Sequence, residues 1–188
     1  MRRAAFVLTL LVVAALSQPT YAQYQTRDRS ILGLHLMVYL PSDHLIKAAG
    51  DVWIGPSVDY NFTFDENDRP TTTISLGWAT SDTILARAKY APLTITRLNY
   101  FGGQSNAWYV AGGLGIYFTN FKGWDTSTST YESFNDKTFG FNIRVGKQFG
   151  EVWYAEARYD ITGDTGLLSG YSTDFSGLTL SVGTRVLY

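Results

Sequence analysis

The sequence lacks cysteine altogether, and its 188 residues include only two histidines. Without cysteine, an exported chain has no disulfides and no thiol for lipid attachment, so backbone pairing and burial must hold it together. Two histidines and no cysteine, with no carboxylates clustered at ligand spacing, give no support for a metal site. We therefore expect neither a metal nor any other cofactor.

A strong charge of one sign is also missing. The chain carries 15 Lys+Arg against 16 Asp+Glu, and removing Arg2 and Arg3 with the N-terminal segment described next leaves 13 against 16, a net charge of −3. A nearly neutral chain has no basic field of the kind that attracts nucleic acid. We therefore expect no nucleic-acid partner.

Only one long apolar run is present, and it lies at the N-terminus. After a basic start (MRR), residues 4–16 carry no charge, and small residues stand at Thr20 and Ala22, the two positions that a signal peptidase reads. This predicts a secretory signal peptide over residues 1–22, cleaved after Ala22, and one mature domain over residues 23–188. Thirteen apolar residues are too few for a spanning helix, which needs about 20.

Sustained helical periodicity is absent after this segment, whereas aromatic residues and glycine are abundant. The chain has 13 Tyr, 11 Phe, 5 Trp and 18 Gly, a mixture that suits strands and tight turns. Eight segments alternate apolar and polar residues with period two, as strands do. They span residues 31–40, 51–64, 71–80, 91–101, 107–121, 138–149, 152–161 and the end of the chain from Leu178. The predicted fold class is all-β.

The connections between these segments alternate in length. Short ones cover residues 65–70, 102–106 and 150–151, and long ones cover residues 41–50, 81–90, 122–137 and 162–177. An up-and-down antiparallel sheet with all its short turns at one end gives this rhythm, and transmembrane barrels have their short turns on the periplasmic side. The sequence therefore predicts an eight-stranded antiparallel up-and-down transmembrane β-barrel.

Period two sorts the side chains into two faces, whose contents indicate which one is inside. One face carries branched aliphatics and rings: Leu32, Leu34, Leu36, Val38, Val52, Ile54, Val58, Tyr60, Phe62, Phe64, Ile74, Leu76, Trp78, Trp108, Val110, Leu114, Ile116, Phe118, Phe139, Phe141, Ile143 and Val145. The other carries charges and the glycines Gly33, Gly55, Gly77, Gly113, Gly115, Gly140, Gly146 and Gly183. Glycines suit a crowded interior and large aromatics a convex exterior. The apolar face is therefore predicted to meet lipid, the reverse of a soluble lipocalin-like barrel.

An aromatic girdle is expected at the edges of the apolar band, formed by Trp78, Trp108, Phe118 and Phe139. The stretch from Trp108 to Phe118, tilted near 40°, spans roughly 25 to 28 Å of hydrocarbon. Turning the barrel inside out would place arginines against lipid, at a cost of about 2 to 4 kcal/mol for each one at the midplane. The length and the energy both favour the lipid-facing assignment.

The segment 91–101 does not sort cleanly. If Arg97 points inward, then Ile95 turns inward too, and Thr94 lies on the lipid face. A β-bulge near Pro92, which cannot donate to a ladder, is one explanation. The register of this strand is therefore left open.

Several segments resemble the small eight-stranded outer-membrane barrels of the OmpA/OmpX/OmpW type. They are residues 108–115 (WYVAGGLG), 92–94 with 100–101, 155–159 (AEARY) and the terminal strand, so the likeness extends over nearly all of the mature chain. Chains of that type end on an aromatic residue after alternating apolar positions, and the resemblance implies that the outer-membrane assembly machinery recognises this ending. Leu180, Val182, Val186 and Tyr188 match the pattern, and Thr184 departs from it. The last strand is expected to pair with the first and close the cylinder.

Seven polar side chains are predicted to form an interior network: Arg144, Glu156, Arg158, Asp160, Arg185, Asp59 and His35. An ion-pair plug is favoured over a gated polar path because eight strands leave little more room than side chains need. Catalysis, as in lipid A-modifying barrels, needs Ser and His within hydrogen-bond reach. His35 could approach Ser181 only behind the barrel wall, and His44 lies in a loop, so no catalytic residue is predicted.

Two long connections carry aromatic and aliphatic residues on polar stems, namely Trp124, Tyr131 and Phe134 in one and Leu167, Leu168, Tyr171 and Phe175 in the other. These side chains suit contact with lipopolysaccharide, a host surface or another protein. The alternative is that the strands extend beyond the membrane as a ribbon whose rings pack on each other.

We expect a monomer in the bacterial outer membrane, in contact with its lipid and lipopolysaccharide. Its expected role is structural or surface-interacting: envelope integrity, adhesion or binding of a small apolar ligand. A narrow pore for small hydrophobic or ionic solutes is the first alternative and a soluble carrier the second.

Overall fold

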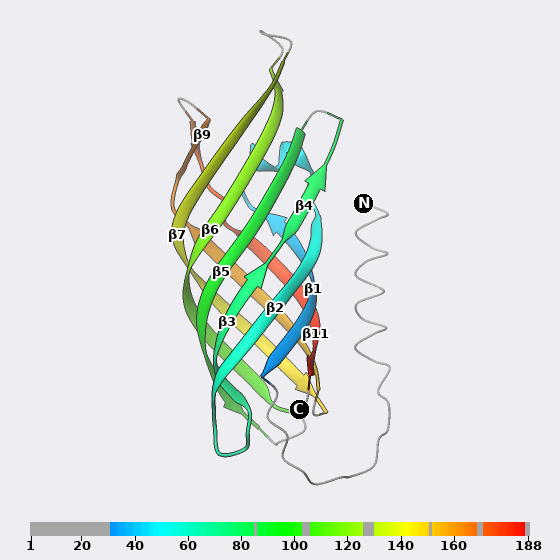
Figure 1. Cartoon of the computed structure of the whole chain (residues 1–188), viewed down its shortest axis with the longest axis vertical. Helices are drawn as coiled ribbons and strands as arrows, with labels where there is room; N and C mark the ends of the chain where they lie inside the picture. The colour runs from blue at the N-terminus through cyan, green and yellow to red at the C-terminus, as the bar shows by residue number, and fades with distance from the viewer. Residues whose placement is uncertain are drawn as a thin grey trace.

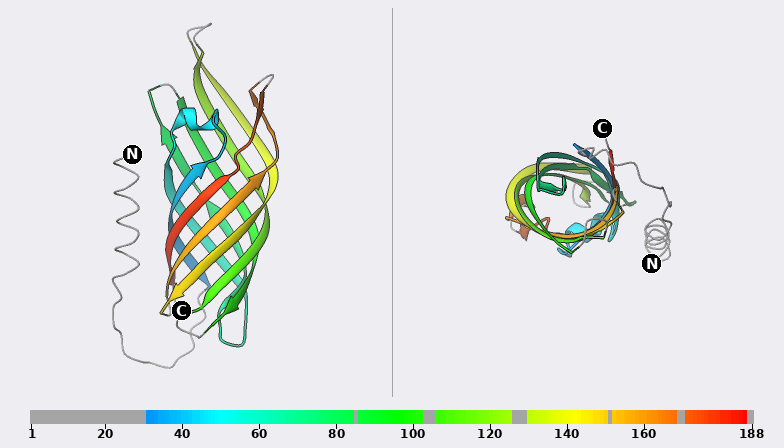
Figure 2. Two further views of the ribbon diagram at one scale, coloured as in Figure 1. Left: turned by 180° about the vertical axis from the view of Figure 1, so that it is seen from behind. Right: turned by 90° about the horizontal axis from the view of Figure 1, so that it is seen from below.

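The structure is a closed antiparallel β-barrel, seen from the side in Figure 1 and along its axis in Figure 2. This computed structural model describes residues 31–84, 86–102, 106–125, 130–150, 152–168 and 171–186. The wall consists of β1 (Leu32–Pro41), β2 (Trp53–Phe64), β3 (Pro70–Gly77) continued by β4 (Ala79–Asp82), β5 (Ala86–Phe101), β6 (Trp108–Asp125), β7 (Thr130–Phe149), β8 (Trp153–Thr162) and β11 (Gly177–Val186). The predicted eight-stranded all-β barrel is confirmed.

The cylinder closes between its first and last strands. Each strand pairs with its neighbours in sequence, and β1 pairs both with β2 and with β11, where His35 lies opposite Gly183. No β1 or β11 edge is therefore left for lipid, in which an unpaired backbone group costs several kcal/mol. The predicted pairing of the last strand with the first is confirmed.

The third wall strand is divided at Trp78, which lies between two prolines. The register of β5 continues from Leu76–Leu93 to Ala79–Tyr90, so Pro92 falls opposite Gly77. On the other side, the N–H of Trp78 donates to the carbonyl of Pro56 at 2.9 Å. Because neither proline has an N–H to donate in return, the ladder weakens here while the register continues.

The orientation predicted from the glycines is the one observed. Large apolar side chains of the predicted lipid face are exposed, for example Leu76 at 54%, Leu114 at 68% and Phe139 at 79%. In β11 every second residue, from Gly177 to Arg185, is buried. Val38 shares the outward parity but is only 6% exposed, for which the described residues offer no physical explanation.

The structure defines the register of segment 91–101, which forms part of strand β5. Its pairing with β6 runs without a shift from Ala86–Gly123 to Phe101–Trp108, so no bulge occurs at Pro92. Thr94 lies inside and Ile95 outside, the reverse of the arrangement that an inward Arg97 would require. Arg97 is outward, and its Nη1 donates to Thr72 Oγ1 at 3.0 Å, next to the β2–β3 turn. A long arginine near a barrel end can carry its charge toward water, so its outward position is tolerated.

The connections at one end differ from the predicted long loops. Residues 81–90 are mostly strand, because β4 and β5 are joined by a tight turn in which the N–H of Thr83 donates to the Ala86 carbonyl at 2.8 Å. Residues 122–125 and 130–137 prolong β6 and β7 into a ribbon beyond the barrel wall (Figure 1). Residues 162–177 include the small hairpin of β9 (Thr165–Leu168) and β10 (Tyr171–Thr173), and residues 41–50 include the short helix η1 (Ile46–Ala49). The strict alternation of short and long connections was therefore wrong at the β4–β5 turn, since pairing with β6 extends the ladder.

Some sequence predictions fall outside the described residues. The signal peptide over residues 1–22 and the terminal Tyr188 lie there, as do the side chains of Trp124, Tyr131, Leu167, Leu168 and Tyr171. Within the described ranges, no helix has the length and apolar character needed to cross a membrane.

Candidate functional site

The barrel interior is the candidate site, and its glycines make room for inward tyrosines. A Cβ on Gly183 would lie 2.9 Å from the ring of Tyr154, and one on Gly33 would lie 2.8 Å from the Tyr154 hydroxyl. A Cβ on Gly146 would collide with the ring of Tyr109 on the neighbouring strand. The interior glycines therefore provide the space in which tyrosine rings lie flat against the wall.

The middle of the lumen holds the ion pair of Arg144 on β7 and Glu156 on β8. Arg144 Nη1 lies 3.4 Å from Glu156 Oε1, and the Tyr109 hydroxyl donates to Glu156 Oε2 at 3.1 Å. The remaining Arg144 donors reach Asn142 Oδ1 at 2.9 Å and Thr94 Oγ1 at 2.8 Å. The guanidinium thus joins β5, β7 and β8 across the lumen.

His35 on β1 is paired with a carboxylate and a phenol. Its Nε2 lies 2.8 Å from Asp59 Oδ2 and also contacts the Tyr154 hydroxyl, with the two rings edge to face. Ser181, the candidate nucleophile weighed above, lines the same small cavity, but the described contacts of His35 go to Asp59 and Tyr154. This arrangement fixes the imidazole inside the wall and offers no Ser–His hydrogen bond.

A second ion pair lies nearer the end of the barrel that carries the β9–β10 hairpin. Arg158 Nε is 3.0 Å from Asp160 Oδ2, and both side chains are almost completely buried. The other oxygen of Asp160 accepts a hydrogen bond from the Tyr117 hydroxyl at 3.0 Å. Thr179 on β11 lies within 3.5 Å of both charged groups. The pair is therefore buried and hydrogen-bonded to side chains of β6 and β11.

Arg185 and its partners close the mouth of the barrel beside the β2–β3 turn. Its guanidinium donates to Gln148 Oε1 at 2.9 Å and to the Tyr100 hydroxyl at 2.7 Å. The guanidinium of Arg69, from the β2–β3 turn, lies over the Tyr100 ring at 4.8 Å and is held by Asp65 at 2.7 Å. Partial burial disfavours the charged form of Asp65, but the backbone and side-chain hydrogen bonds from Arg69 outweigh it and lower the pKa of this carboxyl below its ordinary value.

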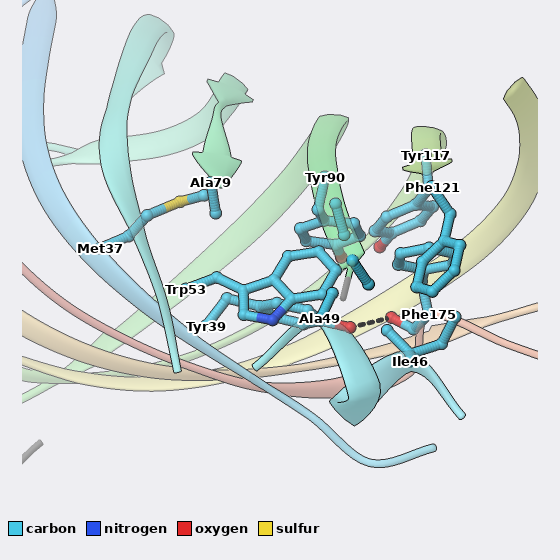
Figure 3. Packing of buried hydrophobic residues seen from close by; sticks show 12 residues of the cluster. Met37, Tyr39, Ile46, Ala49, Trp53, Ala79, Tyr90, Tyr117, Phe121 and Phe175 are labelled. Carbon is cyan, nitrogen blue, oxygen red and sulfur yellow. Dashed lines mark hydrogen bonds between the residues drawn. The ribbon is translucent and has the colours of Figure 1, made fainter. Parts of the chain in front are cut away.

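An aromatic cluster, called here the aromatic cap, fills the opposite end of the lumen (Figure 3). The Tyr39 ring stacks on Tyr90 at 4.3 Å, and its hydroxyl donates to the Phe175 carbonyl at 2.6 Å. Helix η1 contributes Ile46 and Ala49 to the same cluster. The full cap comprises Met37, Tyr39, Ile46, Ala49, Trp53, Ala79, Ala86, Ala88, Tyr90, Tyr117, Phe121 and Phe175. It closes this mouth of the barrel with apolar side chains.

Little space remains between these layers. Two cavities adjoin the central ion pair, share Asp59, Arg144 and Glu156 as lining, and each have room for about one water molecule. The buried charges of the described lumen are the arginines 144, 158 and 185 and the carboxylates 59, 156 and 160, which balance when His35 is neutral. The arrangement is suited to filling and bracing a barrel, and the described residues contain no cluster of metal-binding side chains.

The structure places the seven residues of the predicted network together inside the barrel, and the four predicted girdle residues outside. Of the predicted assembly signal, Leu180, Val182 and Val186 lie half-buried on the outward face of β11. The sequence analysis missed the aromatic cap, because it assigned large rings to the exterior. Strand parity could have placed Tyr39 and Trp53 inside, because both share the inward parity of neighbouring glycines. Parity could not place Tyr90 and Phe175, because the sequence predicted loops at both positions.

Comparison with solved structures identifies the fold. The N-terminal β-barrel domain of Pseudomonas aeruginosa OprF aligns with a TM-score of 0.54 and 15% identity, over 85% of this chain and 99% of that one. Neisserial surface protein A (NspA) aligns with a TM-score of 0.57 and 12% identity, over 84% of this chain and 96% of that one. The fold is that of the eight-stranded outer-membrane barrels. Neither a family model nor a curated protein matches the sequence, and at these identities the likeness to the two outer-membrane barrels concerns the fold alone.

Proposed function

We propose that the chain is an integral protein of the bacterial outer membrane whose filled barrel anchors a surface structure. One observation carries this proposal: the wall exposes a band of apolar side chains, while three arginines and three carboxylates of the wall strands are buried inside. In water such a band would be a large exposed hydrophobic patch that promotes aggregation, whereas in lipid it is the surface expected of a transmembrane barrel. The soluble carrier is disfavoured because its barrel would need the opposite arrangement.

The filled lumen supports a structural or surface-interacting role more than conduction. A path along the axis would have to pass Arg185 and Tyr100 at one mouth, the Arg144–Glu156 pair in the middle and the aromatic cap at the other end. The two water-sized cavities beside Arg144 are the observation that keeps a narrow pore as the second candidate. Catalysis finds no support, since the His35 contacts lie behind the wall.

The β6–β7 ribbon supports a role at the cell surface. These strands continue to Asp125 and from Thr130, about seven residues past the outer edge of the apolar band at Phe118. At a strand tilt near 40° this is an extension of roughly 15 to 20 Å. The ribbon provides a surface for adhesion or for binding a ligand outside the membrane. Export through a signal peptide, recognition of the terminal strand by the assembly machinery and a monomeric state complete the proposal.

Reconstitution of the mature chain tests it in two steps. The refolded protein should float with lipid vesicles and lose this property only when denatured; a compact monomer that stays in solution without detergent would show that the membrane assignment is wrong. In planar bilayers we expect no reproducible single-channel steps. Steps that change when Arg158 or Glu156 is replaced would instead favour the pore.

A further inference from the structure

The outer surface of the barrel carries a basic patch on three adjacent strands. Arg87 and Lys89 on β5, Lys122 on β6 and Lys137 on β7 are all exposed and share the outward parity of their strands. Among the described residues with this outward parity, one acid, Asp82 on β4, lies beside them and pairs with Arg87 at 2.8 Å. No described acidic side chain pairs with Lys122 or Lys137, so the patch has an excess of positive charge.

The strand register brings these cations together. Arg87 and Lys122 lie directly opposite each other, and Lys89 lies opposite Asn120, two residues from Lys122. Like charges directly opposite on neighbouring strands repel and destabilise a sheet. Asp82 already compensates Arg87, and an anion bound beside Lys89 and Lys122 would offset the positive charge that the Arg87–Asp82 pair leaves uncompensated. The arrangement is therefore one that a negatively charged ligand would stabilise.

The height of the patch indicates which anion is in reach. Trp78 and Phe118, the rings at the upper edge of the apolar band, both fall opposite Ala91 of β5, and Lys89 is two residues further along that strand. The Lys89 ammonium lies 5.6 Å above the Trp78 ring. Lys137 lies opposite Phe118, and Phe139 follows two residues toward the band. The cations thus begin where the hydrocarbon ends, at the level of lipid headgroups.

The rest of this rim has a different charge. On the side of β1, β2, β8 and β11 the connections carry Asp43, Asp51, Asp164 and Asp174, with Lys47 as the described lysine. The positive charge is therefore confined to the outward face of β5–β7 and is not a general property of the rim.

We propose that this basic patch binds the phosphate groups of an outer-leaflet glycolipid such as the lipid A part of lipopolysaccharide, with Lys89, Lys122 and Lys137 as ligands. The inference rests on the proposed membrane location and adds to it a binding site and a ligand. Acyl chains of the same lipid lie against Phe118 and Phe139 below the patch. The barrel thereby recruits an anionic lipid to one side of its wall.

Native mass spectrometry of the full mature chain in detergent micelles tests the proposal with bisphosphoryl lipid A as the probe. The test variant is Lys122→Gln/Lys137→Gln. The matched control is Lys47→Gln/Lys147→Gln, which removes the same charge from η1 and from the opposite rim, where Lys147 lies over Trp108 at 5.3 Å. From the attraction of single cations to anionic membrane surfaces, we expect about thirtyfold weaker lipid binding in the test variant and no change in the control.

Two further arms identify the ligand. Monophosphoryl lipid A should bind more weakly than the bisphosphoryl form to the unaltered chain and lose less in the test variant, and inorganic phosphate should not displace the lipid. Equal losses in both variants, or no loss in either, would overturn the proposal. So would heparin binding that depends on the patch while lipid A binding does not, since the ligand would then be a surface glycan. Vesicle flotation is measured on the same samples: a chain that floats but fails these tests contradicts the phosphate site alone, whereas a chain that does not float contradicts the membrane location.

Discussion

The Arg158–Asp160 pair allows a direct measurement of how dry the lumen is. Replacing Asp160 by Asn keeps the shape of the side chain and removes the negative charge. The amide oxygen can still accept from Arg158 and Thr179 while its NH2 donates to the Tyr117 hydroxyl, so the hydrogen bond to Tyr117 is reversed. Asp160 is 0% exposed, and Arg158 would keep its guanidinium in the lumen without its nearest partner. The substitution therefore isolates the electrostatic part of the interaction.

The expected magnitude follows from the geometry. At the 3.0 Å separation of Arg158 Nε and Asp160 Oδ2, an effective dielectric constant near 20 gives an attraction of about 5 kcal/mol, and bulk water would give about 1 kcal/mol. Measured costs of breaking a buried pair are about 3 to 5 kcal/mol. We therefore expect Asp160→Asn to lower the free energy of unfolding by about 3 to 5 kcal/mol, and Arg158→Met/Asp160→Asn to recover most of that loss because no charge is left unpaired.

The measurement is reversible urea unfolding in lipid vesicles, followed by tryptophan fluorescence. Asp82→Asn is the control, since it breaks the Arg87–Asp82 pair, whose side chains are 58% exposed. Such a surface pair contributes less than about 1 kcal/mol. If Asp160→Asn costs no more than Asp82→Asn, or if the double variant recovers nothing, the lumen is hydrated and the filled-barrel argument fails.

Three other predictions concern the wall and its turns. Gly183→Ala should lower the free energy of unfolding by about 1 to 3 kcal/mol because its Cβ meets the Tyr154 ring at 2.9 Å. Gly112→Ala, on the open outer face, should be tolerated. Equal urea midpoints for the two variants would contradict the close packing of Tyr154 on Gly183. Leu114→Arg, in the middle of the apolar band, should lower the free energy of unfolding in vesicles by about 2 to 4 kcal/mol. A spin label at position 114 should be accessible to lipid-dissolved oxygen. Quenching by an aqueous reagent would instead show that this face of the barrel does not meet lipid. Asp65 has a lowered pKa in the folded chain, so its stabilisation is present above about pH 3.8, the ordinary value, and is lost as the pH falls through the folded pKa. The stability difference between the unaltered chain and Asp65→Asn should therefore shrink in acid, and a constant difference would contradict the role of its hydrogen bonds.

Much of the barrel wall could be predicted from the sequence because strand parity is a local property. In β6, Trp108, Val110, Leu114 and Phe118 alternate with small or polar residues, and only one orientation keeps both sets in suitable surroundings. The closure of β1 on β11 followed from the same argument, since an open edge is not tolerated in lipid. These inferences needed no knowledge of particular contacts.

The upper ends of the strands could not be predicted in this way. Residues Ala86 to Lys89 have neither β-branched nor aromatic side chains, so the sequence gives no strand signal there. They are strand because β6 pairs with them, residue by residue, up to Gly123. The orientation of β5 was also not predictable from its own residues, because the charged Arg97 suggested an inward position and is in fact outward. Pairing with a longer neighbour outweighed local preference in both cases.

The interior was predictable in its charges but not in its layers. Charged side chains in the middle of a lipid-facing wall are costly unless they turn inward, so His35, Asp59 and the three buried arginines could be placed from parity alone. Which acid pairs with which base depends on the shear of the barrel, and the aromatic cap gathers Tyr39, Tyr90 and Phe175 from segments far apart in the chain. Such long-range packing leaves no local signature.

The aromatic cap and the ion pairs beneath it depend on each other. The cap covers one end of the lumen with apolar side chains, and a low dielectric beneath it strengthens the Arg158–Asp160 attraction while raising the cost of leaving either charge alone. In turn, Asp160 accepts a hydrogen bond from the hydroxyl of Tyr117, a member of the cap. The Tyr117 hydroxyl beneath the apolar layer therefore has a hydrogen-bond partner. A hydrated channel along the axis would weaken both arrangements at once. The closed lumen is therefore a condition for the stability of this barrel, and any opening large enough to conduct must break at least one of the two layers.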